Sequence, residues 1–457
     1  MGRGHIENIS VIGLGKLGAC MAAALASRGF NVIGCDVDRR KSEALHNGVA
    51  VTEEPNLQET IELAGSRLTA TNDFKQAVLE TDTSFFILPT PSLSDGSFSN
   101  DLLIAAFKSV VKILTERRKQ RHLFIVSSTI TPGTCAKVLE PLLKQTLAHS
   151  GIEFGLCYNP QFIALGNVIN GLLKPDLVLV GESDLTSGEL VAQIQRKLAT
   201  NSPPIQRMSN INAELAKIAL NCAVTMKISF VNQLSNVCAK IPGADPDVIL
   251  QAIGKDRRIG NDYLKPGLGF GGPCFPRDNR LFQFVAESVG ADAALSRATD
   301  QINDDVNCRL FETVSRYCPP GARVGVLGLA YKPLTDVTDE SAGIGLCRRL
   351  ADAARTVFAH DYLASKNASS ALAETSVHIC SDPAEILQEA CRTIVVTCPW
   401  PQYRKFFEMN KYCFRGTHTT VLDPWRLLQS IVDHDVHYIT TLDSPKAVAS
   451  AKVATHF

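Results

Sequence analysis

One short stretch decides the fold of the first part of the chain: Val11-Ile12-Gly13-Leu14-Gly15-Lys16-Leu17-Gly18. Its apolar start is typical of a buried strand, and its glycines stand where that strand would turn into a helix. Glycine permits the tight turn and lets the backbone approach a pyrophosphate, and the start of the helix offers unpaired N–H groups. Asp36 ends the next run of strand residues and is the expected acceptor for both ribose hydroxyls of an adenosine. The spacing therefore predicts a dinucleotide-binding unit rather than an ordinary tight turn.

The charges that follow this turn bear on which dinucleotide is bound. A carboxylate at position 36 repels a 2′-phosphate, which favours NAD over NADP. Arg39 and Arg40 follow closely and would attract such a phosphate, so NADP stays open as the alternative. We predict NAD as the cofactor.

Further β-branched runs alternate with helical patterns on both sides of a long central segment, which is typical of parallel α/β sheets. In the first half we predict strands at residues 9–12, 31–35, 84–88 and 124–127, with a helix at 102–116. In the second half we predict strands at residues 323–328, 356–359, 393–397 and 420–422. Between them, apolar residues at helical spacing without proline or glycine predict one long helix over residues 211–239.

These patterns together predict an α/β protein with two Rossmann-like doubly wound domains, joined by a long central helix and a helical dimerisation region. The predicted parts are residues 1–205, 206–317 and 318–457. Because a long helix between two domains commonly serves as a hinge, a dimer contact or both, we expect a homodimer or a higher homo-oligomer.

Length and composition exclude several other classes of protein. At roughly 150 residues per domain, 457 residues exceed a single small module. The 46 basic and 46 acidic residues, with 45% hydrophobic residues, fit neither a disordered chain nor a basic nucleic-acid surface. The fourteen cysteines are scattered without a C-x-x-C pair, and we find neither a signal peptide nor a long apolar run. We expect a cytoplasmic protein with no membrane span, no metal site and no disulfide framework.

One cysteine stands in a segment that is unusually rich in glycine and proline: Gly267-Leu268-Gly269-Phe270-Gly271-Gly272-Pro273-Cys274-Phe275-Pro276-Arg277-Asp278. This composition predicts an irregular loop whose glycines let the backbone crowd a ligand and leave the thiol accessible. A following helix would bring Asp278 back toward Cys274, and Arg277 would favour the thiolate. A catalytic thiol is the favoured interpretation, and a buried structural cysteine is the alternative.

The long helix carries a second set of candidate groups. Glu214, Lys217 and Asn221 are spaced i, i+3 and i+7, so they share one helical face. A lysine and an amide on one stripe can stabilise an oxyanion. Taken by itself, however, this helix is better explained as a solvated face with ordinary salt bridges.

Five motifs occur along the chain in a fixed order. They are the nucleotide turn, Ser128-Thr129-Ile130-Thr131-Pro132-Gly133-Thr134, Glu214-Leu215-Ala216-Lys217 with Asn221, the cysteine segment, and Gly328-Leu329-Ala330-Tyr331-Lys332-Pro333. In this order they resemble the UDP-glucose/GDP-mannose dehydrogenase family, and within it the UDP-glucose 6-dehydrogenases most. The likeness extends from about Ile9 to the region of Trp425.

The resemblance implies an N-terminal NAD domain, a central dimerisation region and a C-terminal domain for the sugar nucleotide. It implies a four-electron oxidation of the C6 alcohol of a nucleotide sugar, a UDP-hexose above all, to the uronic acid with two NAD. A cysteine thiohemiacetal and then a thioester are the implied intermediates.

The resemblance also implies residue roles. Cys274 matches the nucleophile and Asp278 the base or water-orienting acid, while Lys217 and Asn221 match the oxyanion donors and Thr129 a water-positioning group. The implied cofactor contacts are Gly13, Gly15, Lys16, Leu17, Gly18, Asp36, Thr90, Pro91 and Thr129. The implied substrate contacts are Phe162, Ile163, Lys217, Asn221, Arg258, Tyr263, Leu264, Gly271 and Lys332. Of these, Arg258 matches a residue that reaches the substrate of the neighbouring subunit.

One departure from the family affects the chemistry. The family's Asn-Pro-Glu-Phe-Leu-x-Glu-Gly segment is Asn159-Pro160-Gln161-Phe162-Ile163-Ala164-Leu165-Gly166, so both carboxylates are missing. The first is the family's general base for thioester hydrolysis, and losing such a base costs about 10²–10⁴-fold in rate. Gln161 can orient a water that another base deprotonates. Alternatively, the reaction stops at the aldehyde, or another nucleophile intercepts the thioester. A non-enzymatic NAD or sugar-nucleotide sensor is a further alternative, against which the joint presence of the other catalytic groups speaks.

Two other departures affect the substrate domain. Asp339 stands where the family carries Arg or Lys, and Asp-Gly-Arg-Asn is replaced by Asp423-Pro424-Trp425-Arg426. An anion in place of a cation weakens the binding of a pyrophosphate unless another charge compensates. Trp425 is expected either to stack on a base or sugar or to pack in the core.

Overall fold

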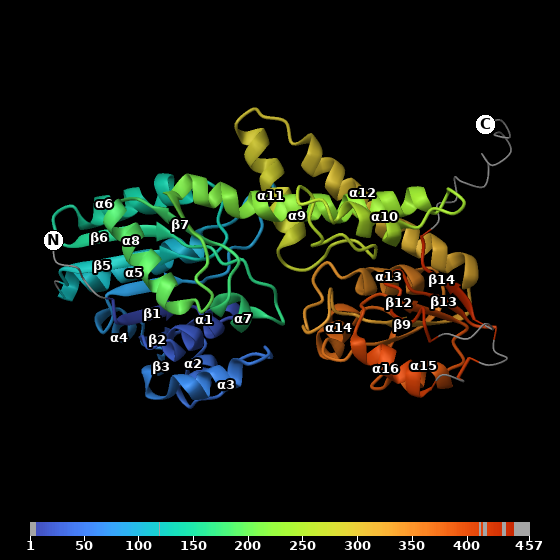
Figure 1. The fold of residues 1–457 in the computed structure, drawn as a ribbon. Helices are drawn as coiled ribbons and strands as arrows, with labels where there is room; N and C mark the ends of the chain where they lie inside the picture. Colours follow the sequence, from blue (N-terminus) through green and yellow to red (C-terminus); the bar gives the residue numbers. More distant parts are fainter. Residues whose placement is uncertain (1–5, 118, 411–412, 415–417, 432–435, 443–457) are drawn as a thin grey trace. The chain divides into compact units, whose positions relative to one another are not determined.

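The structure, a computed structural model, describes residues 6–117, 119–410, 413–414, 418–431 and 436–442 (Figure 1). The chain divides into two compact units, Met1–Leu220 and Asn221–Phe457. The outer ends of the predicted first and third domains, residues 1–5 and 443–457, lie outside the described residues.

The first unit is built around one sheet whose strand order is β3-β2-β1-β4-β5-β6-β7-β8. The first six of these strands have the Rossmann order. The strands are β1 (Asn8–Ile12), β2 (Asn31–Cys35), β3 (Leu68–Thr71), β4 (Thr83–Phe86), β5 (Arg121–Val126), β6 (Glu153–Tyr158), β7 (Val178–Glu182) and β8 (Ile205–Ser209). Every neighbouring pair is parallel except β6 and β7, which are antiparallel.

Helices cover both faces of this sheet, and the central strands β1, β4 and β5 are accordingly buried along almost their whole length. The helices are α1 (Lys16–Ser27), α2 (Arg39–His46), α3 (Leu57–Ala64), α4 (Phe74–Leu79), α5 (Asp101–Arg117), α6 (Glu140–Leu147), α7 (Val168–Leu173) and α8 (Leu185–Leu198). Helices α1, α2, α3, α7 and α8 pack on one face, and α4, α5 and α6 pack on the other.

The second unit repeats this plan with the strand order β11-β10-β9-β12-β13-β14, in which all neighbours are parallel. Its strands are β9 (Arg323–Leu327), β10 (Thr356–His360), β11 (His378–Ile379), β12 (Thr393–Val396), β13 (Thr420–Leu422) and β14 (His437–Ile439). Helices α12 (Ala294–Tyr317), α13 (Ala342–Asp352) and α14 (Ser365–Ala371) pack on one face. Helices α15 (Pro383–Gln388) and α16 (Pro401–Met409) pack on the other.

A 29-residue helix, α9 (Asn210–Cys238), begins in the first unit and ends in the second. It agrees with the predicted helix over 211–239 to within one residue at each end. The second unit also contains α10 (Pro246–Ile253) and α11 (Phe275–Ser288). The predicted fold class, with two doubly wound domains and a long central helix, is confirmed.

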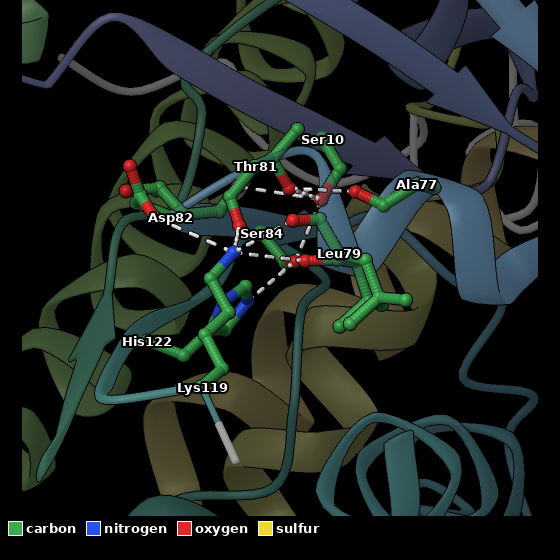
Figure 2. Close-up of polar contacts among 10 residues, drawn as sticks. Ser10, Ala77, Leu79, Thr81, Asp82, Ser84, Lys119 and His122 are labelled. Atoms are coloured by element: carbon green, nitrogen blue, oxygen red, sulfur yellow. Dashed lines mark hydrogen bonds and ion pairs between the residues drawn. The ribbon is translucent and has the colours of Figure 1, made fainter. Parts of the chain in front are cut away.

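A buried polar network links β1, β4 and β5 of the first sheet (Figure 2). Ser10 of β1 and Ser84 of β4 share a hydrogen bond of 2.6 Å, and Ser84 Oγ lies 2.8 Å from Nε2 of His122 on β5. Lys119 donates to the carbonyl oxygens of Val78 and Leu79 at 3.1 and 3.3 Å. The network surrounds the amino ends of β4 and β5, so it lies at the opposite edge of the sheet from the nucleotide turn.

Candidate functional site

The nucleotide turn joins β1 to α1. Gly13 has a φ of 99°, and a Cβ there would overlap the carbonyl oxygen of Ile87. A Cβ at Gly18 would overlap the carbonyl oxygen of Gly13. In contrast, nothing lies within 4 Å of a Cβ placed on Gly15, which directly precedes α1. The outer two glycines are therefore required by the protein itself, whereas Gly15 leaves room for a ligand at the start of the helix.

Asp36 is held in place beside this turn. Its Oδ2 accepts a hydrogen bond from the N–H of Leu14 at 2.7 Å, and its Oδ1 accepts one from the N–H of Asp38 at 2.8 Å. Lys41 Nζ lies 3.8 Å from Oδ2. These backbone N–H groups hold the carboxylate beside the nucleotide turn, just after the end of β2.

A cavity of about 1080 Å³ opens next to the turn and suits a dinucleotide. Its lining includes the predicted cofactor residues Gly13, Gly15, Lys16, Leu17, Gly18 and Asp36. Arg39 and Arg40 are not in this lining, and they pair with Glu43 at 2.6 Å and Asp38 at 3.0 Å on the surface. The open position at Gly15 and this cavity fit NAD, and the two arginines are engaged elsewhere.

The loops after β4 and β5 are tied together by hydroxyl groups. Ser128 Oγ donates to the carbonyl of Leu88 at 2.7 Å and accepts the N–H of Leu88 at 2.8 Å. Thr90 Oγ1 donates to the carbonyl of Thr129 at 2.6 Å. Pro91 is exposed, and neither Thr90 nor Pro91 is among the residues that line the cavity. The cofactor roles of Thr90, Pro91 and Thr129 stay predictions.

Lys217 is buried on α9 and faces the segment after β6. Its Nζ donates to the backbone carbonyl of Gln161 at 3.1 Å and lies 4.8 Å from the ring centroid of Phe162. Lys217 is therefore a buried cation that packs against residues 159–166, the segment that differs from the family. The alternative of a solvated helix face is wrong at this position.

Gln161 belongs to a cluster of amides. Its Nε2 donates to the backbone carbonyl and to Oδ1 of Asn159, at 3.1 and 3.0 Å. Gln195 Nε2 donates to the same Oδ1 at 2.7 Å, and Asn159 Nδ2 donates to the carbonyl of Leu179. Leu165, at the second missing carboxylate, packs against the apolar core, and Ile163 lies against Gly171. Gln161 and Leu165 therefore supply no carboxylate at the two positions where the family carries one.

Cys274 lies immediately before α11 and is exposed. All fourteen cysteines lie in the described part of the chain, and Cys308 is the only other exposed one. Exposure contradicts the alternative of a buried structural cysteine at this position. By contrast, burial raises the pKa of Cys222 on α9 to about 12.

The first turn of α11 brings Asp278 back over the cysteine, as predicted. The N–H of Asp278 donates to the carbonyl of Cys274 at 2.9 Å. The Asp278 carboxylate is buried, and its Oδ2 accepts a hydrogen bond from Asn221 Nδ2 at 2.6 Å. Two of the predicted catalytic side chains are thus in direct contact, although 57 positions separate them in the sequence.

The glycines of the cysteine loop pack against protein. A Cβ at Gly267 would overlap the ring of Trp425, and one at Gly271 would overlap the carbonyl of Glu340. Gly272 has a φ of 83°, and a Cβ there would overlap the ring of Tyr331. At these three positions protein atoms fill the space that a Cβ would need, and the approach of the loop backbone to a ligand stays a prediction. The predicted contact of Gly271 with substrate stays a prediction for its backbone atoms.

The remaining predicted substrate residues differ in exposure. Arg258 is exposed and pairs with Asp256 at 2.6 Å, and Tyr263 is half-exposed with a φ of 61°. Leu264 packs in a small apolar cluster with buried residues of α9 and α10. Lys332 Nζ lies 5.8 Å from the ring centroid of Tyr331. The substrate roles of these four residues stay predictions.

The altered C-terminal motif has a structural role. Trp425 is partly buried, packs against the apolar core, and donates from Nε1 to the carbonyl of Thr397 at 3.3 Å. Arg426 pairs with Asp247 at 2.9 Å. Packing of Trp425 in the core is therefore the supported alternative, and the displaced cation is engaged by a carboxylate of α10.

Two residues that hold the candidate site groups in place, Gln195 and Asn279, could not be predicted from the sequence. A single amide in an amphipathic helix is common, so nothing in the sequence distinguishes Gln195. Asn279 follows Asp278 directly and is buried; its Oδ1 accepts from Thr225 and Ser296, and its Nδ2 donates to Asp300 at 2.7 Å. It fixes α11 against α9 and α12.

The two Rossmann-type sheets and the nucleotide turn place the chain in the class of dinucleotide-binding α/β proteins. Models of the UDP-glucose/GDP-mannose dehydrogenase family match it in three parts. The NAD binding domain matches residues 7–199, the central domain residues 211–305 and the UDP binding domain residues 325–430. The chain belongs to this family, and it is an NAD-dependent nucleotide-sugar dehydrogenase.

Individual relatives agree with this assignment. The chain is 34% identical over 400 residues to the UDP-glucose 6-dehydrogenase AglM of Haloferax volcanii, covering 86% of this chain and 92% of that protein. It is 31% identical over 347 residues to the GDP-mannose 6-dehydrogenase of Pseudomonas aeruginosa, covering 75% and 78%. A solved UDP-glucose dehydrogenase from Pyrobaculum islandicum superposes with a TM-score of 0.86 at 30% identity, covering 97% of this chain and 100% of that one. None of the helices in the described part of the chain combines the length and hydropathy needed to cross a bilayer.

Proposed function

We propose that the chain oxidises the C6 alcohol of a UDP-hexose to the uronic acid, with two NAD per substrate. The contact between Asn221 and Asp278, one turn after the exposed Cys274, carries the proposal. A buried carboxylate held by an amide next to a reachable thiol is an arrangement for acyl chemistry. A plain alcohol dehydrogenase needs no thiol, because two-electron oxidation forms no acyl intermediate.

In this proposal the residues of the chain divide the work as follows. Asp278 accepts the alcohol proton, directly or through a water, and bound NAD supplies the hydride acceptor. Cys274 adds to the resulting aldehyde to form a thiohemiacetal, and loss of the second hydride leaves a thioester. Lys217 and Asn221 stabilise the oxyanion by donating N–H groups, and Thr129 positions the water. Hydrolysis of the thioester then releases the acid and restores the thiol.

Gln161 supports a second candidate, in which the reaction stops at the aldehyde or another nucleophile takes the thioester. An amide accepts no proton at neutral pH. Both N–H groups that its Nε2 offers are directed at oxygens of Asn159. The acid-forming reaction remains our main proposal because Asp278 is also able to deprotonate water.

The stoichiometry of NADH separates the acid from the aldehyde, and identification of the product by mass spectrometry separates the acid from the product of another nucleophile. Wild-type protein is incubated with NAD and, separately, UDP-, GDP-, CDP- and dTDP-hexoses, and NADH is counted per substrate consumed. About two NADH per UDP-hexose supports the acid and about one supports the aldehyde. Cys274→Ala should allow at most one hydride transfer. If none of these donors reduces NAD, the proposed function is wrong.

We also propose that the chain works as a homodimer through α9 and α12. Apolar side chains surround a hollow of about 940 Å³ there, and Phe230, Ile259 and Leu295 are 49%, 46% and 63% exposed. Arg258 lines the same hollow, which supports its proposed reach toward a neighbouring subunit. Phe230→Glu should convert the dimer to monomer in light scattering, and an unchanged mass would contradict this surface.

The proposed division of labour follows the predicted parts. Residues 1–205 bind NAD, residues 206–317 carry the cysteine loop and the dimer surface, and residues 318–457 bind the sugar nucleotide. The three matched family domains support this division. The absence of a disulfide among the fourteen cysteines supports a reducing compartment, for which we propose the cytoplasm.

A further inference from the structure

Glu214 on α9 is a fully buried carboxylate with two backbone partners. Its Oε2 accepts the N–H of Gly133 at 2.5 Å, and its Oε1 accepts the N–H of Cys135 at 2.9 Å. Burial raises the pKa of Glu214, and the two N–H donors act in the opposite direction. A buried acid without such partners is strongly unfavourable, so these two bonds fix the position of the loop relative to the helix.

The loop that Glu214 holds is the one that carries Thr129. On its other side, this loop is fastened to the loop after β4. Thr90 Oγ1 donates to the carbonyl of Thr129, and the N–H of Phe98 donates to Oγ1 of Thr131 at 3.0 Å. Residues 127–135 are therefore held between the loop after β4 and helix α9.

The same turn of α9 holds a second loop. Lys217 follows Glu214 by three positions, so the two side chains share a helical face. Lys217 donates to the carbonyl of Gln161 in the loop after β6. One helical turn thus fastens the loops that follow two adjacent strands, β5 through Glu214 and β6 through Lys217.

We propose that Glu214 is a positioning residue for the oxidation: by holding the N–H groups of Gly133 and Cys135, it fixes the Thr129 loop relative to Lys217. This inference rests on the proposed function for its effect on turnover. Glu214 itself contacts no reacting atom. Its substitution should therefore lower kcat much more than it changes the KM for NAD.

The experiment compares wild type with Glu214→Gln, in which one carboxylate oxygen becomes an NH₂ group that opposes an N–H. Glu214→Asp is the second variant, since it keeps the charge but shortens the reach. Hydrogen exchange of residues 128–139 reports on the loop without substrate. We expect faster exchange confined to this segment, and a fall in kcat of about 10- to 100-fold with UDP-glucose and NAD.

Asp184→Ala is the matched control. Asp184 accepts the N–H of Ser187 at 2.9 Å at the start of α8, so its loss also removes a carboxylate cap in the first unit. It should lower stability without changing exchange at 128–139. Unchanged exchange in that segment, or an even increase over the whole chain, overturns the proposal. Failure of wild type to reduce NAD with UDP-glucose and the other donors refutes the proposed function, and the exchange result still decides whether Glu214 holds the loop.

Discussion

Asn221 Nδ2 donates to Asp278 Oδ2 at 2.6 Å, and both side chains are buried. Asn221 lies on α9 and Asp278 on α11, so the bond joins the long helix to the helix that follows the cysteine loop. An amide donor stabilises the ionised form of a carboxylate, which is the form that can accept a proton.

Asn221→Asp places a second carboxylate against the first. Two acids at this separation cannot both ionise, so the pKa of one of them rises. We expect the acid limb of the pH profile of kcat to move to higher pH, and kcat at neutral pH to fall by about 10²–10³-fold. Steady-state rates between pH 5.5 and 9 check this.

Cys222→Ala is the control for that substitution. Cys222 Sγ lies 3.8 Å from the backbone carbonyl oxygen of Asp278, to which it donates a hydrogen bond. It should leave the pH profile unchanged. A profile for Asn221→Asp that coincides with the wild-type one would show that the bond has no part in the chemistry.

Gln161→Glu restores a carboxylate at the position of the family's base. A carboxylate has no N–H for the two oxygens of Asn159, so the ionised side chain must turn away from them. We expect faster breakdown of the Cys274 thioester, by up to about 10²–10⁴-fold. Mass spectrometry of acid-quenched enzyme measures the bound acyl group over time.

Gln161→Ala controls for that gain, because it removes the amide without adding a base. It should not accelerate the breakdown. If Gln161→Glu also leaves the lifetime of the thioester unchanged up to pH 9, Gln161 does not limit hydrolysis.

Asp36→Ser tests the choice of dinucleotide. Asp36 is held by the N–H groups of Leu14 and Asp38, and Lys41 lies 3.8 Å away. Without the carboxylate, a 2′-phosphate meets this lysine instead of an anion. We expect the ratio of kcat/KM for NAD to that for NADP to fall by about 10²-fold. Arg40→Ala should leave the ratio unchanged, since Arg40 pairs with Asp38 on the surface; a fall there would mean that the arginine reaches the cofactor.

Eight of the strands could be predicted because each is a short, mostly buried apolar run, whereas β3 and β8 are partly exposed and lack that pattern. The pairing of the strands was harder to predict. Hydropathy does not indicate the direction of a strand, so the antiparallel pairing of β6 with β7 could not be predicted from it. The cysteine loop shows the same limit. Its glycines predicted an irregular path, but Gly267 faces Trp425, far along the chain. Helical spacing likewise placed Asn221 on the correct face and could not identify Asp278 as its partner.

The last prediction concerns acid stability and the network of Figure 2. Burial, and to a lesser extent Lys119, lowers the pKa of His122 to about 3. In the unfolded chain this pKa is about 6.5, so below that pH the unfolded state binds a proton that the folded state refuses, and stability falls until the pH nears 3. His122→Gln keeps an amide near Ser84 and cannot titrate. Between pH 7 and pH 5, its loss in free energy of unfolding should be about 2 kcal/mol smaller than that of wild type. Urea unfolding at the two pH values measures this difference. His149→Gln is the control, because His149 is exposed. If the free energy of unfolding falls equally in all three proteins, His122 is not the responsible group.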